Sequence, residues 1–241
     1  MASSDTGSRL EAVIFDWGGT LSDHAMVELE DMWLLAARHL APERGLEVAA
    51  QLAAVESAFW ERSAMDHRAW TLADLLAEAR EAIGADIAEA VFEEAGVHYL
   101  DAWTPHIRHA SDAGEVLRAL RTRGLRVGLL SNTHWPRAFH ERFLERDGLA
   151  RLIDARLYTS EMSYAKPHAE AFGAALAALG VSDPSRAVFV GDRPYDDVYG
   201  AQRAGMRGVL RKNPAVPDYD VQPDASIETL SELIDYIDEW L

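Results

Sequence analysis

The chain has 241 residues, of which 49% are hydrophobic and 26% charged, with a formal net charge of −17 and no cysteine. This length accommodates one large domain or a core with a smaller insertion. The acidic balance excludes nucleic acid and anionic membrane surfaces as expected partners, because both require a basic face. Without cysteine the chain has no disulfides, no thiolate catalysis and no Cys-ligated zinc.

Hydropathy gives no stretch of roughly 18 uncharged apolar residues, the length that a membrane helix needs. The first nine residues are polar and lack the apolar run of a secretory signal. We therefore expect a cytoplasmic protein.

The first predicted element is a strand over residues 11–16. Its apolar run, residues 12–15, is typical of a buried parallel strand, and Asp16 stands at its carboxyl end. Open α/β sheets handle their ligands at that end. Gly18 and Gly19 then permit a tight turn and a close approach of the backbone to a ligand. Taken alone, Asp16 is equally explained as a cap of the turn.

The next segment, residues 22–108, has apolar residues at spacings of three and four, which predicts helices. Thr71 and Asp74 form a capping-box variant at the start of one helix. The aromatic side chains of this segment are expected in the helical core, with a substrate pocket as the alternative: Trp33, Phe59, Trp60, Trp70, Tyr99 and Trp103. Trp17 and Trp135, outside the segment, are the better pocket candidates because they adjoin polar strand ends.

Strands and helices alternate after residue 108. Further strands are predicted over residues 125–130, 153–158, 187–190 and 206–210. Helices are predicted over residues 113–123, 136–146, 169–179 and 197–204, and Ser226 is expected to cap a last helix over residues 228–241. Strands separated by single helices predict a parallel sheet with right-handed crossovers. The expected fold class is therefore α/β, a Rossmann-like parallel sheet with an inserted α-helical domain.

Three later segments also carry polar side chains at predicted strand ends or loops: Ser131-Asn132, Lys166, and Gly191-Asp192 followed by Asp196 and Asp197. Lysine occurs at only two positions, and arginine supplies the rest of the positive charge. A lysine retained before Pro167 therefore suggests a site that needs a compact ammonium group.

These segments and Asp16-Trp17-Gly18-Gly19-Thr20, in this order, resemble the motifs of the haloacid dehalogenase-like (HAD) superfamily, most of whose members are Mg2+-dependent phosphatases. The resemblance implies a nucleophile at Asp16 that forms an aspartyl-phosphate and so splits one difficult step into two. It also implies a core of residues 1–22 and 109–241, with a helical C1 cap of residues 23–108 closing over the site.

The resemblance implies a role for each motif residue. Mg2+ is expected on the carboxylates of Asp16 and Asp192 and on the backbone carbonyl of Gly18. The phosphoryl group is expected to bind a set of groups from three motifs: Ser131, Asn132, Lys166, Gly19 and Thr20. Asp196 or Asp197 would orient a metal-bound water or Lys166. The spacing fits both acids and does not choose between them.

Position 18 departs from the commonest family pattern, which has there a second Asp that acts as general acid and base. General acid–base catalysis contributes about 10²–10⁴-fold, so Gly18 predicts weaker activity on poor leaving groups. Either the substrate has a good leaving group, or another residue supplies the proton. The candidates for this substitute acid are Asp23, His24 and His134.

The function expected is a Mg2+-dependent hydrolase of a small phosphorylated metabolite, acting as a monomer or homodimer. The alternative from another class is a non-catalytic module that binds a phosphorylated ligand or a protein. Haloacid dehalogenation is less favoured, since those enzymes carry a bulky aromatic at position 18 and generally lack the acids seen here at positions 192, 196 and 197. Phosphonoacetaldehyde hydrolases need a cap lysine, which residues 23–108 do not contain.

Overall fold

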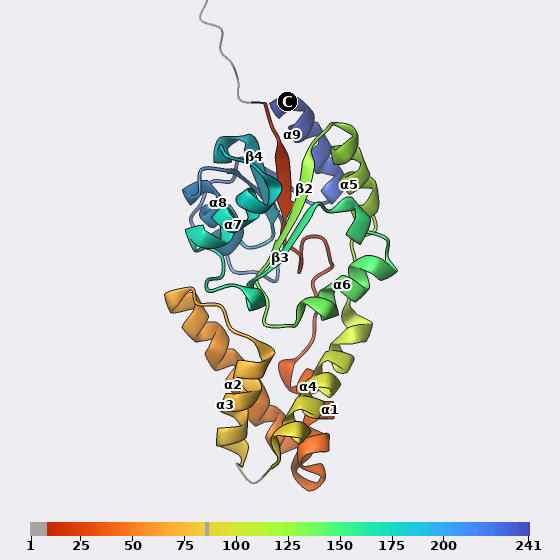
Figure 1. Cartoon of the computed structure of the whole chain (residues 1–241), viewed down its shortest axis with the longest axis vertical. Helices are drawn as coiled ribbons and strands as arrows, with labels where there is room; N and C mark the ends of the chain where they lie inside the picture. The colour runs from red at the N-terminus through yellow and green to blue at the C-terminus, as the bar shows by residue number, and fades with distance from the viewer. Residues whose placement is uncertain (1–8, 85–86) are drawn as a thin grey trace, which may run out of the picture.

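The computed structural model describes residues 9–84 and 87–241; the polar segment before residue 9 lies outside this range. The molecule is elongated and has two lobes (Figure 1). One lobe is an α/β sandwich that carries the carboxyl terminus. The other consists of helices that come from a single stretch near the start of the chain.

A six-stranded sheet forms the centre of the first lobe, and every pairing in it is parallel. The strands are β1 (Ala12–Phe15), β2 (Arg126–Ser131), β3 (Ala155–Tyr158), β4 (Ala187–Gly191), β5 (Arg207–Arg211) and β6 (Ala225–Ile227). Their order in space is β3-β2-β1-β4-β5-β6, the doubly wound order in which ligands bind where the sheet changes direction. The α/β fold class expected from the sequence is confirmed.

Helices cover both faces of the sheet (Figure 1). On one face lie α5 (Ala113–Thr122), α6 (Arg137–Arg146) and α9 (Leu233–Trp240), and on the other α7 (Ala169–Leu179) and α8 (Gly200–Arg203). Along β1, Val13 and Phe15 belong to the first of these cores, and Ala12 and Ile14 to the second. All four are fully buried, because a strand covered on both sides sends alternate side chains into two apolar layers.

Two local predictions need correction. Ser226 does not cap the last helix: it lies in β6, which pairs with β5 through Ala225 and Ile227, and a 3₁₀ turn over Leu230–Glu232 leads into α9. The helix expected over residues 197–204 begins instead as a π-helical turn, Pro194–Tyr199, and continues as α8.

The helical lobe contains α1 (Leu29–Leu40), α2 (Gly45–Asp66), α3 (Leu72–Ile83) and α4 (Glu89–Trp103). It has a hydrophobic core of its own, in which Trp33, Leu52 and Leu75 are fully buried. The predicted capping box is confirmed: Thr71 accepts from the backbone N–H of Asp74, whose side chain accepts in return from the backbone N–H of Thr71. None of the helices within residues 9–84 and 87–241 combines the length and apolar character that crossing a bilayer requires.

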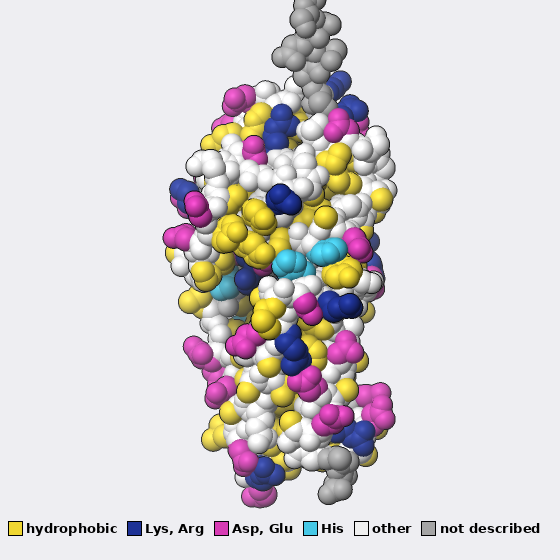
Figure 2. Space-filling view, turned by 90° about the vertical axis from the view of Figure 1, so that its left-hand side faces the viewer, with side chains coloured by type: hydrophobic (Ala, Val, Ile, Leu, Met, Phe, Trp, Pro, Cys, Tyr) yellow, Lys and Arg dark blue, Asp and Glu magenta, His cyan; other side chains and the backbone are white. Residues whose placement is uncertain are grey.

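The two lobes meet over the carboxyl ends of the strands. The chain crosses between them twice in adjacent segments, where the backbone N–H of Asp23 donates to the carbonyl of Arg108 at 2.8 Å. On the other side, the N–H of Ala165 donates to the carbonyl of His67 at 2.8 Å. Figure 2 shows histidines near this junction between the lobes and acidic side chains spread over the helical lobe. Any ligand at the strand ends is therefore enclosed by both lobes.

The helical lobe should depend on its own core. Leu52→Ala removes a fully buried side chain of α2 and should lower the free energy of unfolding by about 2–5 kcal/mol. Leu46→Ala is the matched control on the same helix, where the side chain is 75% exposed, and should change the free energy by less than about 0.5 kcal/mol. Urea unfolding followed by circular dichroism measures both, and equal effects would contradict the assignment of Leu52 to the core.

Candidate active site

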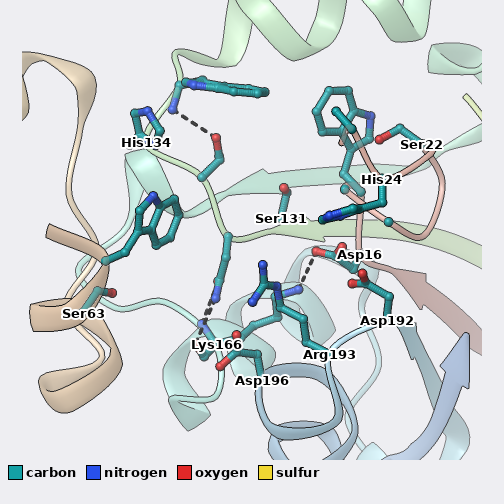
Figure 3. Close-up of a pocket in the computed structure, with 18 of the residues that line it drawn as sticks. Asp16, Ser22, His24, Ser63, Ser131, His134, Lys166, Asp192, Arg193 and Asp196 are labelled. Atoms are coloured by element: carbon teal, nitrogen blue, oxygen red, sulfur yellow. Dashed lines mark hydrogen bonds and ion pairs between the residues drawn. The ribbon is translucent and has the colours of Figure 1, made fainter. Parts of the chain in front are cut away.

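A cavity of about 610 Å³ lies between the lobes, at the carboxyl ends of β1, β2 and β4. The polar residues that the sequence placed at strand ends line it, as Figure 3 shows for Asp16, Ser131, Lys166 and Asp192. These residues lie as far as 176 positions apart in the chain, from Asp16 to Asp192. The parallel sheet brings them together because β1 pairs with both β2 and β4.

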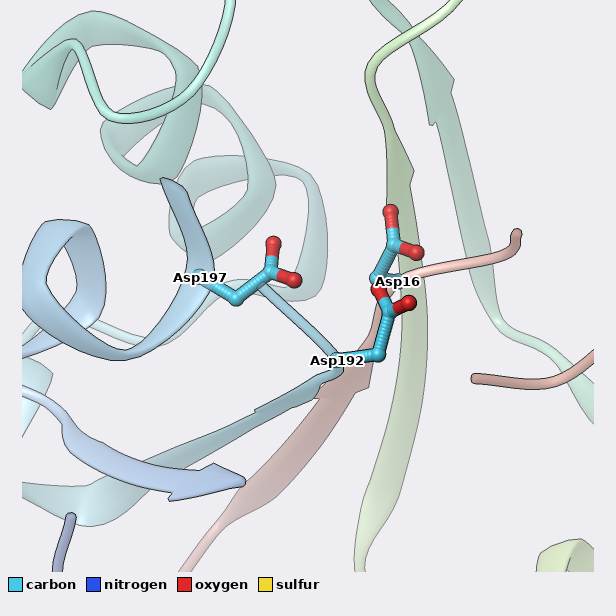
Figure 4. A group of neighbouring side chains, drawn as sticks. All are labelled: Asp16, Asp192 and Asp197. Carbon is cyan, nitrogen blue, oxygen red and sulfur yellow. The ribbon is translucent and has the colours of Figure 1, made fainter. Parts of the chain in front are cut away.

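Three carboxylates cluster at one end of the cavity, and two of them, those of Asp16 and Asp192, line it. One oxygen each from Asp16, Asp192 and Asp197 lies within 4.8 Å of the other two, and Figure 4 shows Asp197 pointing toward the others. All three side chains are buried, at 6%, 2% and 0% exposure. Like charges so close together raise one another's pKa and attract a cation.

Lys166 is the cation that the protein itself supplies. Its Nζ atom donates to Asp16 Oδ1 and to Asp197 Oδ1, both at 2.6 Å. Burial lowers the pKa of Lys166, but the two carboxylates more than offset this and the pKa is raised overall. Lys166 therefore stays protonated and fixes the orientation of both acids.

One lysine does not balance three carboxylates. The pKa of Asp16 is raised to about 7, mainly by burial and, against the opposing charge of Lys166, also by Asp197 and Asp192. Burial and Asp197 likewise raise the pKa of Asp192. In the described part of the chain, the buried Oδ1 atom of Asp192 has no hydrogen-bond partner. A small divalent cation with a preference for oxygen ligands fits this donor set and would supply the missing charge.

The two glycines after Asp16 meet different surroundings. Gly19 has a φ of +80°, and a Cβ atom there would lie 2.0 Å from Asp192 Oδ2, so the loop reaches this carboxylate only with glycine. At Gly18 a Cβ atom would meet nothing within 4 Å. Position 18 therefore faces open space in the cavity, large enough to admit a side chain.

Three of the residues expected to bind a phosphoryl group differ in their access to the cavity and in their hydrogen bonds. Ser131, at 3% exposure, lies on the cavity wall at the end of β2. Asn132 also lines the cavity, but its side-chain amide is engaged with Lys166: Nδ2 donates to the Lys166 carbonyl at 2.9 Å, and Oδ1 accepts from the Lys166 N–H at 2.8 Å. Thr20 is fully buried and is not among the described residues of the wall.

The structure separates the two acids between which the spacing did not choose. Asp197 lies behind Lys166. It accepts one hydrogen bond from the Lys166 ammonium and another, at 2.9 Å, from the backbone N–H of Arg193. Asp196 lies on the cavity wall, where burial and then the charge of Asp197 raise its pKa to about 6.

Two contributors were missed by the sequence analysis. Asn213 donates to Asp192 Oδ2 at 2.7 Å, and Arg193 lines the cavity next to the carboxylates. The signal for Asn213 was its position just after a predicted strand, the same signal that singled out Asp16 and Ser131.

The candidates for a substitute acid occupy different environments. Asp23 and His24 are exposed and line the cavity, and Figure 3 shows the His24 side chain extending toward Asp16. His134 also lines the cavity but is 3% exposed, and burial lowers its pKa to about 3. His134 is therefore neutral at physiological pH.

Comparison with known proteins agrees with this arrangement. The family model of haloacid dehalogenase-like hydrolases matches residues 10–205. A phosphoserine phosphatase of Thermus thermophilus is 32% identical over 230 residues, which cover 92% of this chain and 78% of that protein.

Solved structures of two activities share the fold. A HAD phosphatase from Thermococcus onnurineus superposes with a TM-score of 0.66 at 25% identity, over 95% of this chain and 98% of that one. A 2-haloacid dehalogenase from Pseudomonas syringae pv. tomato gives 0.69 at 26% identity, over 96% and 100%. The overall fold thus does not separate phosphatase from dehalogenase. The family model and the sequence relative agree, however, and the chain belongs to the haloacid dehalogenase-like hydrolases.

Proposed function

We propose that this protein is a Mg2+-dependent phosphatase of a small phosphorylated metabolite and works through an aspartyl-phosphate on Asp16. The observation that carries the proposal is the cluster of Asp16, Asp192 and Asp197 within 4.8 Å, with Lys166 paired to two of them. An excess of carboxylates suits a metal-assisted reaction of an anion. The relative from Thermus thermophilus, named a phosphoserine phosphatase, supports the same substrate class.

The metal would be held by the carboxylates of Asp16 and Asp192 and by the backbone carbonyl of Gly18. Bound there, Mg2+ supplies positive charge beside the reacting phosphoryl group, which would otherwise be repelled by the acids. Asn213 keeps the Asp192 carboxylate in place through its hydrogen bond of 2.7 Å, and Asp197 does the same for Lys166.

In the first step, a carboxylate oxygen of Asp16 attacks phosphorus, and the bond from phosphorus to the ester oxygen breaks. Lys166 holds the attacking carboxylate, and the Ser131 hydroxyl, on the wall of the same cavity, donates to the phosphoryl oxygens as charge develops on them. In the second step, water attacks phosphorus and releases phosphate and the free carboxylate of Asp16.

The leaving group needs a proton that position 18 does not supply. We propose His24 as the first candidate donor, because it is exposed to the cavity and extends toward Asp16 (Figure 3). Asp23 is the second. His134 is disfavoured in this role, since burial leaves it neutral, with a pKa of about 3.

The helices between residues 23 and 108 would act as the cap. In their loop, the His67 carbonyl accepts from the backbone N–H of Ala165 at 2.8 Å, and the N–H of Ala69 donates to the carbonyl of Ser163 at 3.1 Å. Such a closure shields the phosphoenzyme from bulk water and lets cap side chains select the substrate.

Phosphate release from acetyl phosphate and p-nitrophenyl phosphate should require Mg2+ and should disappear in Asp16→Asn, because the amide is not a nucleophile. Inorganic phosphate is measured with Mg2+ and with excess EDTA. Release that persists in EDTA and in Asp16→Asn would refute this mechanism. A binding module would give no release from either protein, while the variant would retain its ligand.

Restoring a carboxylate at position 18 should restore the missing acid. A side chain there meets open space, so Gly18→Asp should raise kcat/KM on alkyl phosphomonoesters such as sugar phosphates by about 10²-fold or more. Acetyl phosphate, whose leaving group needs no proton, should change little.

Gly18→Asn is the matched control for that variant, since it has the same size without the carboxylate. It should leave turnover of alkyl esters at the level of the natural protein. Equal gains in the two variants would show that bulk, and not proton transfer, is responsible.

A further inference from the structure

The cavity extends well beyond the carboxylates, along a surface that the proposed chemistry does not use. We call this surface the distal wall and define it by its six residues: Glu56, Trp60, Trp103, His134, Trp135 and His140. It comes from α2 and α4 of the helical lobe and, in the α/β lobe, from the segment after β2 and from α6. Figure 3 shows His134 on the side of the cavity away from Asp192.

The distal wall is continuous and begins next to the nucleophile. Trp17, the residue after Asp16, contacts the ring of His140 with centroids 4.7 Å apart and that of Trp135 at 6.3 Å. Trp135 contacts Trp103 at 5.0 Å and His134 at 5.8 Å. A leaving group on a phosphoryl group bound at Asp16 would therefore extend along these rings.

The wall contains no lysine or arginine. Among the described residues that line the whole cavity, the only ones of these types are Lys166 and Arg193, both at the carboxylate end. The acids Glu56, Glu61 and Asp23 also line the cavity. Burial lowers the pKa of His134 to about 3 and that of His140 to about 4, so both imidazoles are neutral at physiological pH.

The hydrogen bonds around His134 decide which of its nitrogens carries the proton. Glu56 accepts from Trp33 at 2.7 Å and from Trp60 at 3.4 Å, and its two oxygens lie 3.2 and 3.1 Å from the Tyr99 hydroxyl. The single hydroxyl hydrogen of Tyr99 is donated in a hydrogen bond to the Glu56 carboxylate. His134 Nε2, 3.1 Å from the Tyr99 oxygen, then donates to it, and His134 Nδ1 is left as an acceptor.

His140 also has one ring nitrogen that carries the proton and one that is an acceptor. Its Nδ1 atom lies 3.3 Å from the carbonyl of Pro136, which only accepts, so Nδ1 carries the proton and Nε2 is the acceptor. Both acceptors, His134 Nδ1 and His140 Nε2, are buried and have no hydrogen-bond partner among the described residues. Both rings are therefore neutral and add no positive charge beside the cavity.

We propose that the distal wall binds an amine, so that the substrate is the phosphomonoester of an amino alcohol or aminoalkyl phenol. An ammonium group is attracted by the tryptophan rings of the wall and meets no positive charge there, and the acids Glu61 and Asp23 line the same cavity. A second anionic group in the leaving group would face Glu56 with no nearby lysine or arginine to pair with. The inference rests on the proposed phosphatase function and names its substrate class.

Three aryl phosphates of matched shape test the proposal: 4-(2-aminoethyl)phenyl, 4-propylphenyl and 4-(2-carboxyethyl)phenyl phosphate. Two methylene groups separate the end group from the ring in the charged pair, so the three leaving groups differ little in reactivity. The amine should give the highest kcat/KM, about tenfold above the propyl compound, and the carboxylate the lowest. Equal values, or a preference for the carboxylate, would overturn the proposal.

The same assay separates this proposal from the function on which it rests. Turnover of all three esters at equal kcat/KM keeps the phosphatase and rejects the amine site. Absence of Mg2+-dependent turnover on all three rejects the phosphatase, and the amine site is then judged by binding alone. Calorimetric titration of tyramine and 4-propylphenol into the natural protein, with tighter binding of tyramine expected, provides that measurement.

Glu56→Gln locates the preference on the wall. It keeps the shape of the side chain without the carboxylate, so the ratio of kcat/KM for the amine to that for the propyl ester should fall severalfold. Glu93→Gln is the control, since Glu93 is an exposed acid of α4 that does not line the cavity, and should leave the ratio unchanged. An unchanged ratio in Glu56→Gln would contradict the assignment.

Discussion

The ammonium group of Lys166 holds the site together. It is 3% exposed, lies over the ring of Phe189 at 4.9 Å and pairs with Asp16 and Asp197 at 2.6 Å each. Removing one partner of a buried ion pair costs about 3–5 kcal/mol, because the other charge is left uncompensated. Here two carboxylates would be left. The lysine is anchored at its backbone as well, through both ends of the Asn132 amide, so the Asp16 carboxylate is held at one position.

The sheet imposes the second constraint. Asp16 and Asp192 follow neighbouring parallel strands, and two glycines leave room for the acids of the cluster. A Cβ atom at Gly19 would lie 2.0 Å from the Asp192 carboxylate, and one at Gly191 would lie 2.2 Å from that of Asp197. The repulsion within this cluster favours binding of a divalent cation, which would in turn attract an anionic phosphoryl group.

Much of this site follows from local sequence. An apolar run followed by a polar residue predicts a buried strand and its carboxyl end, and parallel strands bring such ends together, which is how Asp16, Ser131 and Asp192 were found. β6 was missed because three residues carry too little periodicity, and only pairing with β5 makes them a strand. Glu56 and His140 were missed because their meaning depends on tertiary contacts, such as that of Glu56 with Tyr99, 43 positions away.

Gly18 and the distal wall would both affect the activation free energy of the first step. Without an acid at position 18, the barrier of the first step depends on how readily the leaving group departs with its charge. Interactions with parts of the substrate that do not react can lower that barrier when they hold the phosphoryl group in line with Asp16. The tryptophans and imidazoles that begin at Trp17 are placed to provide them, since they extend from the residue next to Asp16 toward the helical lobe. Selectivity and rate would then arise from one surface, which distinguishes this site from one that carries its own general acid.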